Sequence, residues 1–221
     1  MIRLLGRVFF KLTTFLNLRG SMAAGRKKEF DEAAVLDSAM KVFWQKGYVG
    51  TSMSDLTESM GIKKQSLYNA FISKEQLFIK ATDLYLNNRY ANNFSLLYQE
   101  NISLSERMRN CMMSILVRQC DSTEHKGCFV TLCQSDLDSD NMPAEATQKL
   151  IDSDNDILNM WVDLFLTDPE SIALGLNKRA NECSMCIFTT LKGTACMSRI
   201  NTPSTDLTCV IENCLKNIGL H

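Results

Sequence analysis

Apolar residues recur at helical spacing near the start of this 221-residue chain. Over positions 30–46 they follow one another three and four residues apart, which predicts a helix with one buried face. Gly47 is a suitable stop for that helix, because glycine is common just after a helix C-terminus. Ser52 and Asp55 then have the spacing of a capping box. They predict a second, short helix that ends at Gly61.

The same pattern predicts helices over most of the remaining chain. Helices are expected at about 64–70, 74–98, 104–120, 143–166 and 176–199, with a last one from Thr202-Pro203 to Gly219. The segment KGCFVTLCQSDL predicts a further short, buried helix. No run shows the sustained alternation of apolar and polar residues that a half-buried strand needs. The predicted fold class is therefore all-α.

The second and third helices have helix-turn-helix spacing, since a tight turn that begins at Gly61 joins them. Apolar residues on both helices can pack inward and hold the third helix at a fixed angle; they are Leu56, Met60, Ile62, Leu67 and Phe71. The polar residues around the third helix would then face outward; they are Lys63, Lys64, Gln65, Ser66, Tyr68 and Asn69.

The outward residue types suit double-stranded DNA. Lysine attracts phosphate and supplies the salt-dependent part of the affinity. Glutamine and asparagine can form paired hydrogen bonds with adenine edges in the major groove. These residues therefore favour a recognition helix, although a solvated polar face of a three-helix module would have the same spacing.

The ordered residues around this motif resemble a known family. The segment VLDSAMKVFWQKGYVGTSMSDLTESMGIKKQSLYNAFISKEQLF is similar to the DNA-binding domain of TetR/AcrR bacterial repressors, above all in its SLY..F.SKE.LF part. The resemblance implies that Lys64, Gln65, Ser66 and Asn69 approach bases or the nearby backbone. It also implies that Thr51, Tyr68 and Lys74 hold phosphates. Ile72 departs from the small glycine that is usual at its position.

The resemblance implies a ligand-responsive repressor that binds a palindromic operator as a homodimer through its last two helices. A small-molecule effector would bind in the C-terminal helical domain, and no cofactor, metal or membrane partner is expected. Candidate pocket walls are Met112, Ile115, Leu116, Phe129, Leu132, Trp161 and Phe165, which plain core packing explains equally well. The expected domains are residues 22–78 for DNA binding and 79–221 for ligand binding and dimerisation.

Charge is unevenly distributed along the chain. Residues 1–90 carry 14 Lys and Arg against 8 Asp and Glu, whereas residues 91–221 carry 10 against 17. This asymmetry suggests different partners for the two ends, although scattered surface charge is the alternative. Residues 1–21 contain four basic residues that interrupt each apolar run, so a spanning helix is not expected there. We expect them to be a disordered arm or an artefact preceding a start at Met22, with surface-binding helix as the alternative.

The nine cysteines lie mostly within apolar helical segments, which favours free thiols in a reducing cytoplasm. Cys183 and Cys186 form a CxxC motif for which packing is the simplest interpretation, with a redox-responsive thiol or a metal ligand as alternatives. An all-α thiol-dependent redox protein or enzyme that uses Cys128 or this motif is the competing function. No other catalytic arrangement is apparent, so we expect a protein that is not an enzyme.

Overall fold

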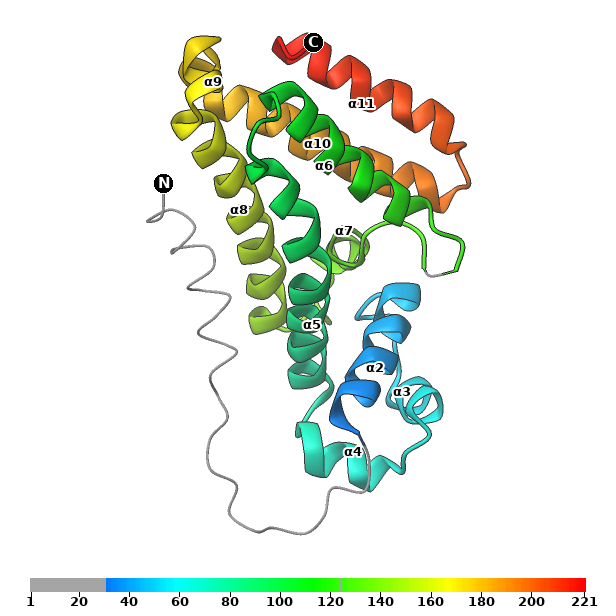
Figure 1. Ribbon diagram of the computed structural model, residues 1–221. Coiled ribbons are helices and arrows are strands. Elements are labelled where there is room, and N and C mark those ends of the chain that lie inside the picture. The colour runs from blue at the N-terminus through cyan, green and yellow to red at the C-terminus, as the bar shows by residue number, and fades with distance from the viewer. Residues whose placement is uncertain (1–30, 124) are drawn as a thin grey trace. The chain divides into compact units, whose positions relative to one another are not determined.

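The computed structural model describes residues 31–123 and 125–221, and within these ranges its regular structure is helical (Figure 1). The expectations for residues 1–21 and for Met22 lie outside the described residues. The α-helices are α2 (Glu32–Lys46), α3 (Met53–Met60), α4 (Lys64–Phe71), α5 (Lys74–Phe94), α6 (Leu104–Cys120), α7 (Phe129–Cys133), α8 (Ala144–Thr167), α9 (Pro169–Ala173), α10 (Ala180–Arg199) and α11 (Ser204–Ile218). The all-α prediction is confirmed.

The start of α3 is fixed by the predicted capping box. The Asp55 amide donates to Ser52 Oγ at 3.1 Å, and the Ser52 amide donates to Asp55 Oδ2 at 2.8 Å. Lys46, the last residue of α2, donates from Nζ to Asp55 Oδ1 at 2.5 Å. Hydrogen bonds from Lys46 first, and then from Ser52, hold the pKa of the Asp55 carboxyl well below its usual range. The end of α2 and the start of α3 are thereby joined.

Two of the expected long helices are subdivided in the structure. The helix expected at 74–98 is α5 up to Phe94, followed by a 3₁₀ turn at Ser95–Tyr98. The helix expected at 176–199 begins as a 3₁₀ turn at Leu176–Arg179 and becomes α10 at Ala180. The tighter winding at these ends shows that hydrophobic spacing locates a helix better than it locates its boundary.

The N-terminal helices are held by an aromatic cluster on α2, the α2–α3 turn and α5. The ring of Phe43 meets that of Phe78 edge to face with centroids 5.1 Å apart, and Tyr48 meets Phe78 at the same distance. Phe43 and Phe78 are fully buried. Such contacts add to the burial of apolar area, so this cluster fixes the α2–α3 turn against α5.

The larger core lies among α6, α8, α10 and α11, which pack on one another (Figure 1). Trp161 and Phe165 of α8 are fully buried there, together with Met112 of α6 and Ile187 of α10. Along the described residues, no helix is long and apolar enough to cross a membrane.

A buried ion pair joins α6 to the junction between α8 and α9. Arg107 Nη2 lies 2.8 Å from Asp168 Oδ2, and the two side chains are 11% and 7% exposed. Arg107 also donates to the carbonyl oxygens of Leu97 and Ile102. Asp168 Oδ1 accepts the amides of Glu170 and Ser171 and so caps α9. The segment TDPE therefore ends α8 and starts α9.

We predict that Arg107→Met lowers the free energy of unfolding by about 3–5 kcal/mol, because it leaves the Asp168 carboxylate buried without its cation. Arg109→Met is the matched control: its ion pair with Glu212 is 47% and 37% exposed. This control should cost less than about 1 kcal/mol. Urea denaturation of both variants measures the difference, and equal losses would contradict the role given to Arg107.

Candidate functional site

The inner side of α4 anchors it to the N-terminal helices. Leu67 and Phe71 are 1% and 2% exposed, and Leu56 of the adjoining α3 is fully buried. Gly61 has a φ of 64° and ends α3 in the left-handed conformation. The two helices pack on one another across this turn, so the orientation of α4 is set by buried contacts and its outer side is left open.

The outer side of α4 carries the polar residues that the sequence indicated. Lys63, Lys64, Gln65, Tyr68 and Asn69 are exposed, whereas Ser66 is half-buried. Gln65 Nε2 donates to Asn69 Oδ1 at 3.2 Å, which places the two amides side by side on one turn of the helix. The two amides therefore offer adjacent hydrogen-bond donors and acceptors to a molecule that binds the outer side of α4.

Lys74 is the first residue of α5, and its side chain contacts an aromatic ring that the sequence did not predict as its neighbour. Its Nζ lies 4.2 Å from the centroid of the Tyr48 ring, and the side chain is half-buried. Burial lowers the pKa of Lys74, and the charges of Asp136 and Asp55 oppose this shift. The ring thus holds the ammonium group at the base of α5, where the predicted phosphate contact remains a prediction.

Thr51 lies beneath the surface, at 2% exposed. Its hydroxyl donates to the carbonyl oxygen of Gly47 at 2.6 Å, and its amide donates to that of Tyr48 at 3.2 Å. In this position Thr51 closes the α2–α3 turn. The expected contact with phosphate stays a prediction, and the hydroxyl has a structural role that the sequence did not indicate.

Ile72 ends α4 in a strained turn. Its φ and ψ are 63° and −53°, and the Ser73 amide donates to the carbonyl oxygen of Phe71 at 2.5 Å. These are the features of the rare γ-turn with positive φ, which is unfavourable for a β-branched residue. The side chain is 78% exposed and gains little from packing. The glycine-like conformation explains why isoleucine is unusual at this position.

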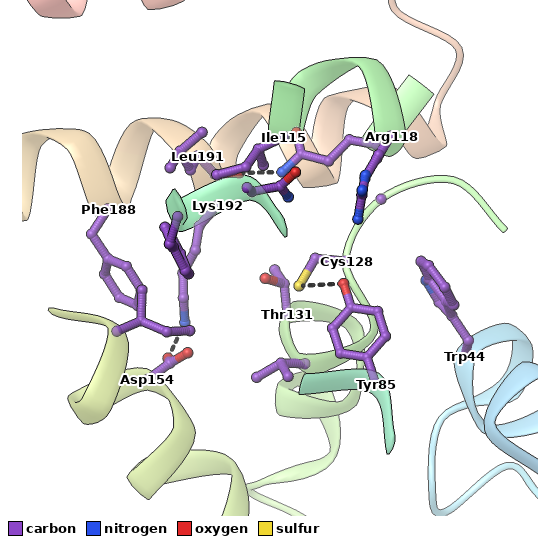
Figure 2. A pocket seen from close by; sticks show the side chains of 16 residues that line it. Trp44, Tyr85, Ile115, Arg118, Cys128, Thr131, Asp154, Phe188, Leu191 and Lys192 are labelled. Carbon is purple, nitrogen blue, oxygen red and sulfur yellow. Dashed lines mark hydrogen bonds and ion pairs between the residues drawn. The ribbon is translucent and has the colours of Figure 1, made fainter. Parts of the chain in front are cut away.

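A cavity of about 80 Å³ lies between the end of α2 and helices α5, α6, α7, α8 and α10 (Figure 2). Each buried water requires roughly 10–15 Å³ of such volume, so the cavity has room for a small molecule. Apolar and aromatic side chains make up most of its wall, including Trp44, Tyr85 and Phe188. Tyr85 Oη donates to Cys128 Sγ at 3.4 Å at this wall.

A half-buried polar cluster lies at another part of the same wall. Lys192 Nζ forms an ion pair with Asp154 and donates to Gln134 Oε1 at 2.6 Å. The same ammonium lies 4.8 Å from the centroid of the Phe188 ring. A ligand with one polar group could exchange partners with this set, whereas the aromatic wall would receive its apolar part.

The cavity has different walls from those expected. Of the seven candidate residues, Ile115 lines it, whereas Leu132 is half-buried outside its lining. The other five are fully or almost fully buried in the core: Met112, Leu116, Phe129, Trp161 and Phe165. Sequence reasoning missed Trp44 and Lys192, because hydrophobic spacing shows that a side faces inward but not whether it meets a neighbour or a space.

The cavity wall is directly connected to the N-terminal helices. Trp44 of α2 meets the Tyr85 ring edge to face at a centroid distance of 5.1 Å. Arg199, at the end of α10, donates from Nη1 to the Trp44 carbonyl oxygen at 3.4 Å. Asp136 Oδ2 accepts the Val49 amide at 3.0 Å. A molecule in the cavity would therefore touch Trp44, the α2 residue whose ring packs on Tyr85 and whose carbonyl oxygen accepts from Arg199.

The N-terminal part of the chain matches a known family. Residues 35–81 match the family described as bacterial regulatory proteins, tetR family. The chain is 38% identical over 106 residues to the transcriptional repressor ComR of Escherichia coli, which covers 48% of this chain and 50% of ComR. It is 37% identical to the regulator YezE of Bacillus subtilis over 48% of this chain and 54% of YezE. The matches thus span about half the length of these curated relatives.

Solved structures extend the likeness of fold to most of the chain. A cysteine mutant of the TetR family regulator CifR, solved with 26-base-pair operator DNA, aligns with a TM-score of 0.77 and 26% identity. The alignment covers 86% of this chain and 98% of that one. A TetR regulator from Legionella pneumophila aligns at a TM-score of 0.70 and 19% identity, over 89% and 99% of the two chains. The second likeness concerns the fold alone.

We predict that Ile72→Gly raises the free energy of unfolding by about 1 kcal/mol, because relief of the positive-φ strain outweighs the extra entropy of glycine in the unfolded chain. Ile151→Gly is the matched control, since Ile151 is also exposed but lies inside α8. It should cost roughly 0.5–1 kcal/mol. Thermal and urea unfolding measure both changes, and a loss of stability in Ile72→Gly would refute the strain argument.

Proposed function

Because this chain belongs to the TetR family of bacterial regulatory proteins, we propose that it is a ligand-responsive transcriptional repressor that binds a palindromic operator as a homodimer. The observation that carries the proposal is the open outer side of α4, where exposed lysines flank the paired amides of Gln65 and Asn69. We propose residues 22–78 as the DNA-binding domain and 79–221 as the ligand-binding and dimerisation domain. Its place of action would be the cytoplasm, where a bacterial operator is located.

Each exposed residue of α4 has a role in the proposed complex. Lys63 and Lys64 would neutralise phosphates at the N-terminal end of the recognition helix. Gln65 and Asn69 would read base edges in the major groove, and Tyr68 would donate from its hydroxyl to the backbone. Supporting this division, the amides lie one turn apart on one side, whereas the two lysines lie at the helix start.

A weakly polar stripe along α10 supports the proposed homodimer. Exposed residues follow one another at intervals of three and four, so they share one side of the helix; they are Met185, Thr189, Gly193, Cys196, Met197 and Ile200. Val210 of α11 is also exposed, at 48%. The two helices lie side by side (Figure 1). A second copy of the same stripe could cover these residues in a two-fold interface.

The cavity supports the proposed response to a small molecule. Its wall includes Trp44 of α2, so an occupant would favour one arrangement of the DNA-binding helices over another. The ligand would change operator binding only to the extent that its affinity differs between the two arrangements. The relatives that were matched are transcriptional regulators. We therefore propose binding, and no catalysis, as the use of this cavity.

A DNA selection experiment tests the proposed recognition. Wild-type protein is expected to enrich a palindromic sequence from random DNA, and Asn69→Ala should lose preference at one base pair in each half-site. The loss should correspond to about 1–3 kcal/mol per bidentate pair, with little change in nonspecific affinity. Asn88→Ala, an exposed asparagine on α5, is the matched control. Failure of the wild type to enrich any sequence would overturn the repressor proposal, and identical sequences from both proteins would overturn the readout by Asn69.

We further predict that Met197→Glu weakens dimerisation on the order of 100-fold, because like charges would meet across the two-fold interface. Leu174→Glu is the matched control: Leu174 is similarly exposed, at 53% against 43% for Met197, but lies at the end of α9. Sedimentation velocity measures both dissociation constants. A Met197→Glu protein that dimerises as strongly as the wild type would exclude this stripe as the interface.

A further inference from the structure

Two thiols from different helices meet between α10 and α11. The Sγ atoms of Cys186 and Cys214 lie 3.5 Å apart, although 28 residues separate them in the chain. Cys186 is half-buried and Cys214 is 5% exposed. The CxxC motif singled out in the sequence therefore has its structural partner in α11, and Cys183 faces the core one turn earlier.

The separation is short enough for a covalent bond to form with small movements. A disulfide has its sulfurs about 2.05 Å apart, so the two atoms must approach by roughly 1.5 Å. Side-chain rotation and a slight shift of either helix can supply this distance. By contrast, the exposed thiols Cys196 and Cys209 point outward from their helices, and such thiols can react with other molecules.

We propose that Cys186 and Cys214 form a reversible dithiol–disulfide site that is oxidised by hydroperoxides. The proposal goes beyond the repressor function, because it depends on neither the operator nor an effector. It adds a covalent link between the two helices that carry the proposed dimer interface.

The different burial of the two thiols assigns their order of reaction. Burial raises the pKa of the Cys214 thiol to about 11, and a hydrogen bond from Thr190 partly opposes this shift. Cys214 is therefore held as a protonated thiol, whereas the half-exposed Cys186 is the sulfur that a hydroperoxide can reach. Cys186 is the first site of oxidation and Cys214 is the resolving thiol.

The two steps balance with a hydroperoxide as the oxidant. The Cys186 sulfur attacks one oxygen of hydrogen peroxide, and the O–O bond breaks. The products are Cys186 sulfenic acid and one water. Cys214 Sγ then attacks Cys186 Sγ: the S–S bond forms, the S–O bond breaks, and the hydroxyl leaves with the Cys214 proton as a second water. Two thiols lose two electrons, and one peroxide accepts them. A dithiol reductant reverses the reaction.

The link would stabilise the C-terminal helices in a measurable way. It closes a loop that contains the second half of α10 and the first part of α11, and closing such a loop restricts the unfolded chain. We expect the oxidised protein to unfold at a temperature about 5–10 °C higher than the reduced protein. Reduction should restore the original unfolding temperature.

The test uses the full chain with Cys196→Ser and Cys209→Ser, which removes the two exposed thiols and their intermolecular disulfides. One equivalent of hydrogen peroxide should lower the mass by 2 Da, and peptide mapping should recover a Cys186–Cys214 disulfide. Adding Cys186→Ser should abolish both the disulfide and the rise in unfolding temperature. Adding Cys120→Ser, which removes a half-buried thiol of α6, should abolish neither.

Two results would overturn the proposal. One is a disulfide that maps to another pair of cysteines in the background protein. The other is oxidation of Cys186 to sulfinic acid, a gain of 32 Da, while Cys214 remains a thiol. Cys214→Ala provides a second variant if Cys186→Ser does not fold. Operator selection by the reduced protein tests the repressor function separately. Failure of the disulfide proposal can therefore be distinguished from failure of the repressor proposal.

Discussion

Aromatic packing between α2, α5 and α7 is the interaction on which both candidate sites depend. Phe78 of α5 contacts Phe43 and Tyr48 on one side and Phe129 of α7 on another, with ring centroids 5.1–5.7 Å apart. The first two contacts hold the α2–α3 turn. The turn leads into α3, which packs on α4, the helix that carries Gln65 and Asn69. The Phe129 contact holds the segment that carries Cys128 at the cavity wall. Loosening one ring would therefore disturb the N-terminal helices and the cavity together.

Polar contacts at the same place restrict how the α2–α3 turn can move. Gly47 has a φ of 72°, and a Cβ there would lie 2.5 Å from Asp136 Oδ2. The same carboxylate accepts the Val49 amide, so the α2–α3 turn must come close to the 3₁₀ turn at Gln134–Asp136 without a side chain between them. Gly47, which the sequence indicated as a helix stop, is therefore needed for a second reason: the Asp136 carboxylate comes too close to leave room for a side chain. This second reason has no local signal in the sequence.

The sequence predicted what local chemistry decides and missed what long-range packing decides. The helices, the Ser52 cap and the exposed side of α4 follow from spacing and from residues within a few positions of one another. Lys74 differs because the ring beside its ammonium group is that of Tyr48, which belongs to the α2–α3 turn and is distant in sequence. The cavity differs for the same reason: its walls come from six helices, and most of the apolar residues proposed for it fill the core instead.

In the proposed repressor, the location of Trp44 would shorten the route from an effector to DNA. This residue is part of α2 and also lines the cavity, and Arg199 of α10 holds its carbonyl oxygen. A ligand would not need a long chain of displaced side chains to reach the DNA-binding helices, since it can contact one of them directly. A difference of about 1.4 kcal/mol in its affinity for two positions of α2 changes their ratio tenfold. One altered contact with the indole ring is of that order, so a small molecule would suffice for the regulation proposed for this cavity.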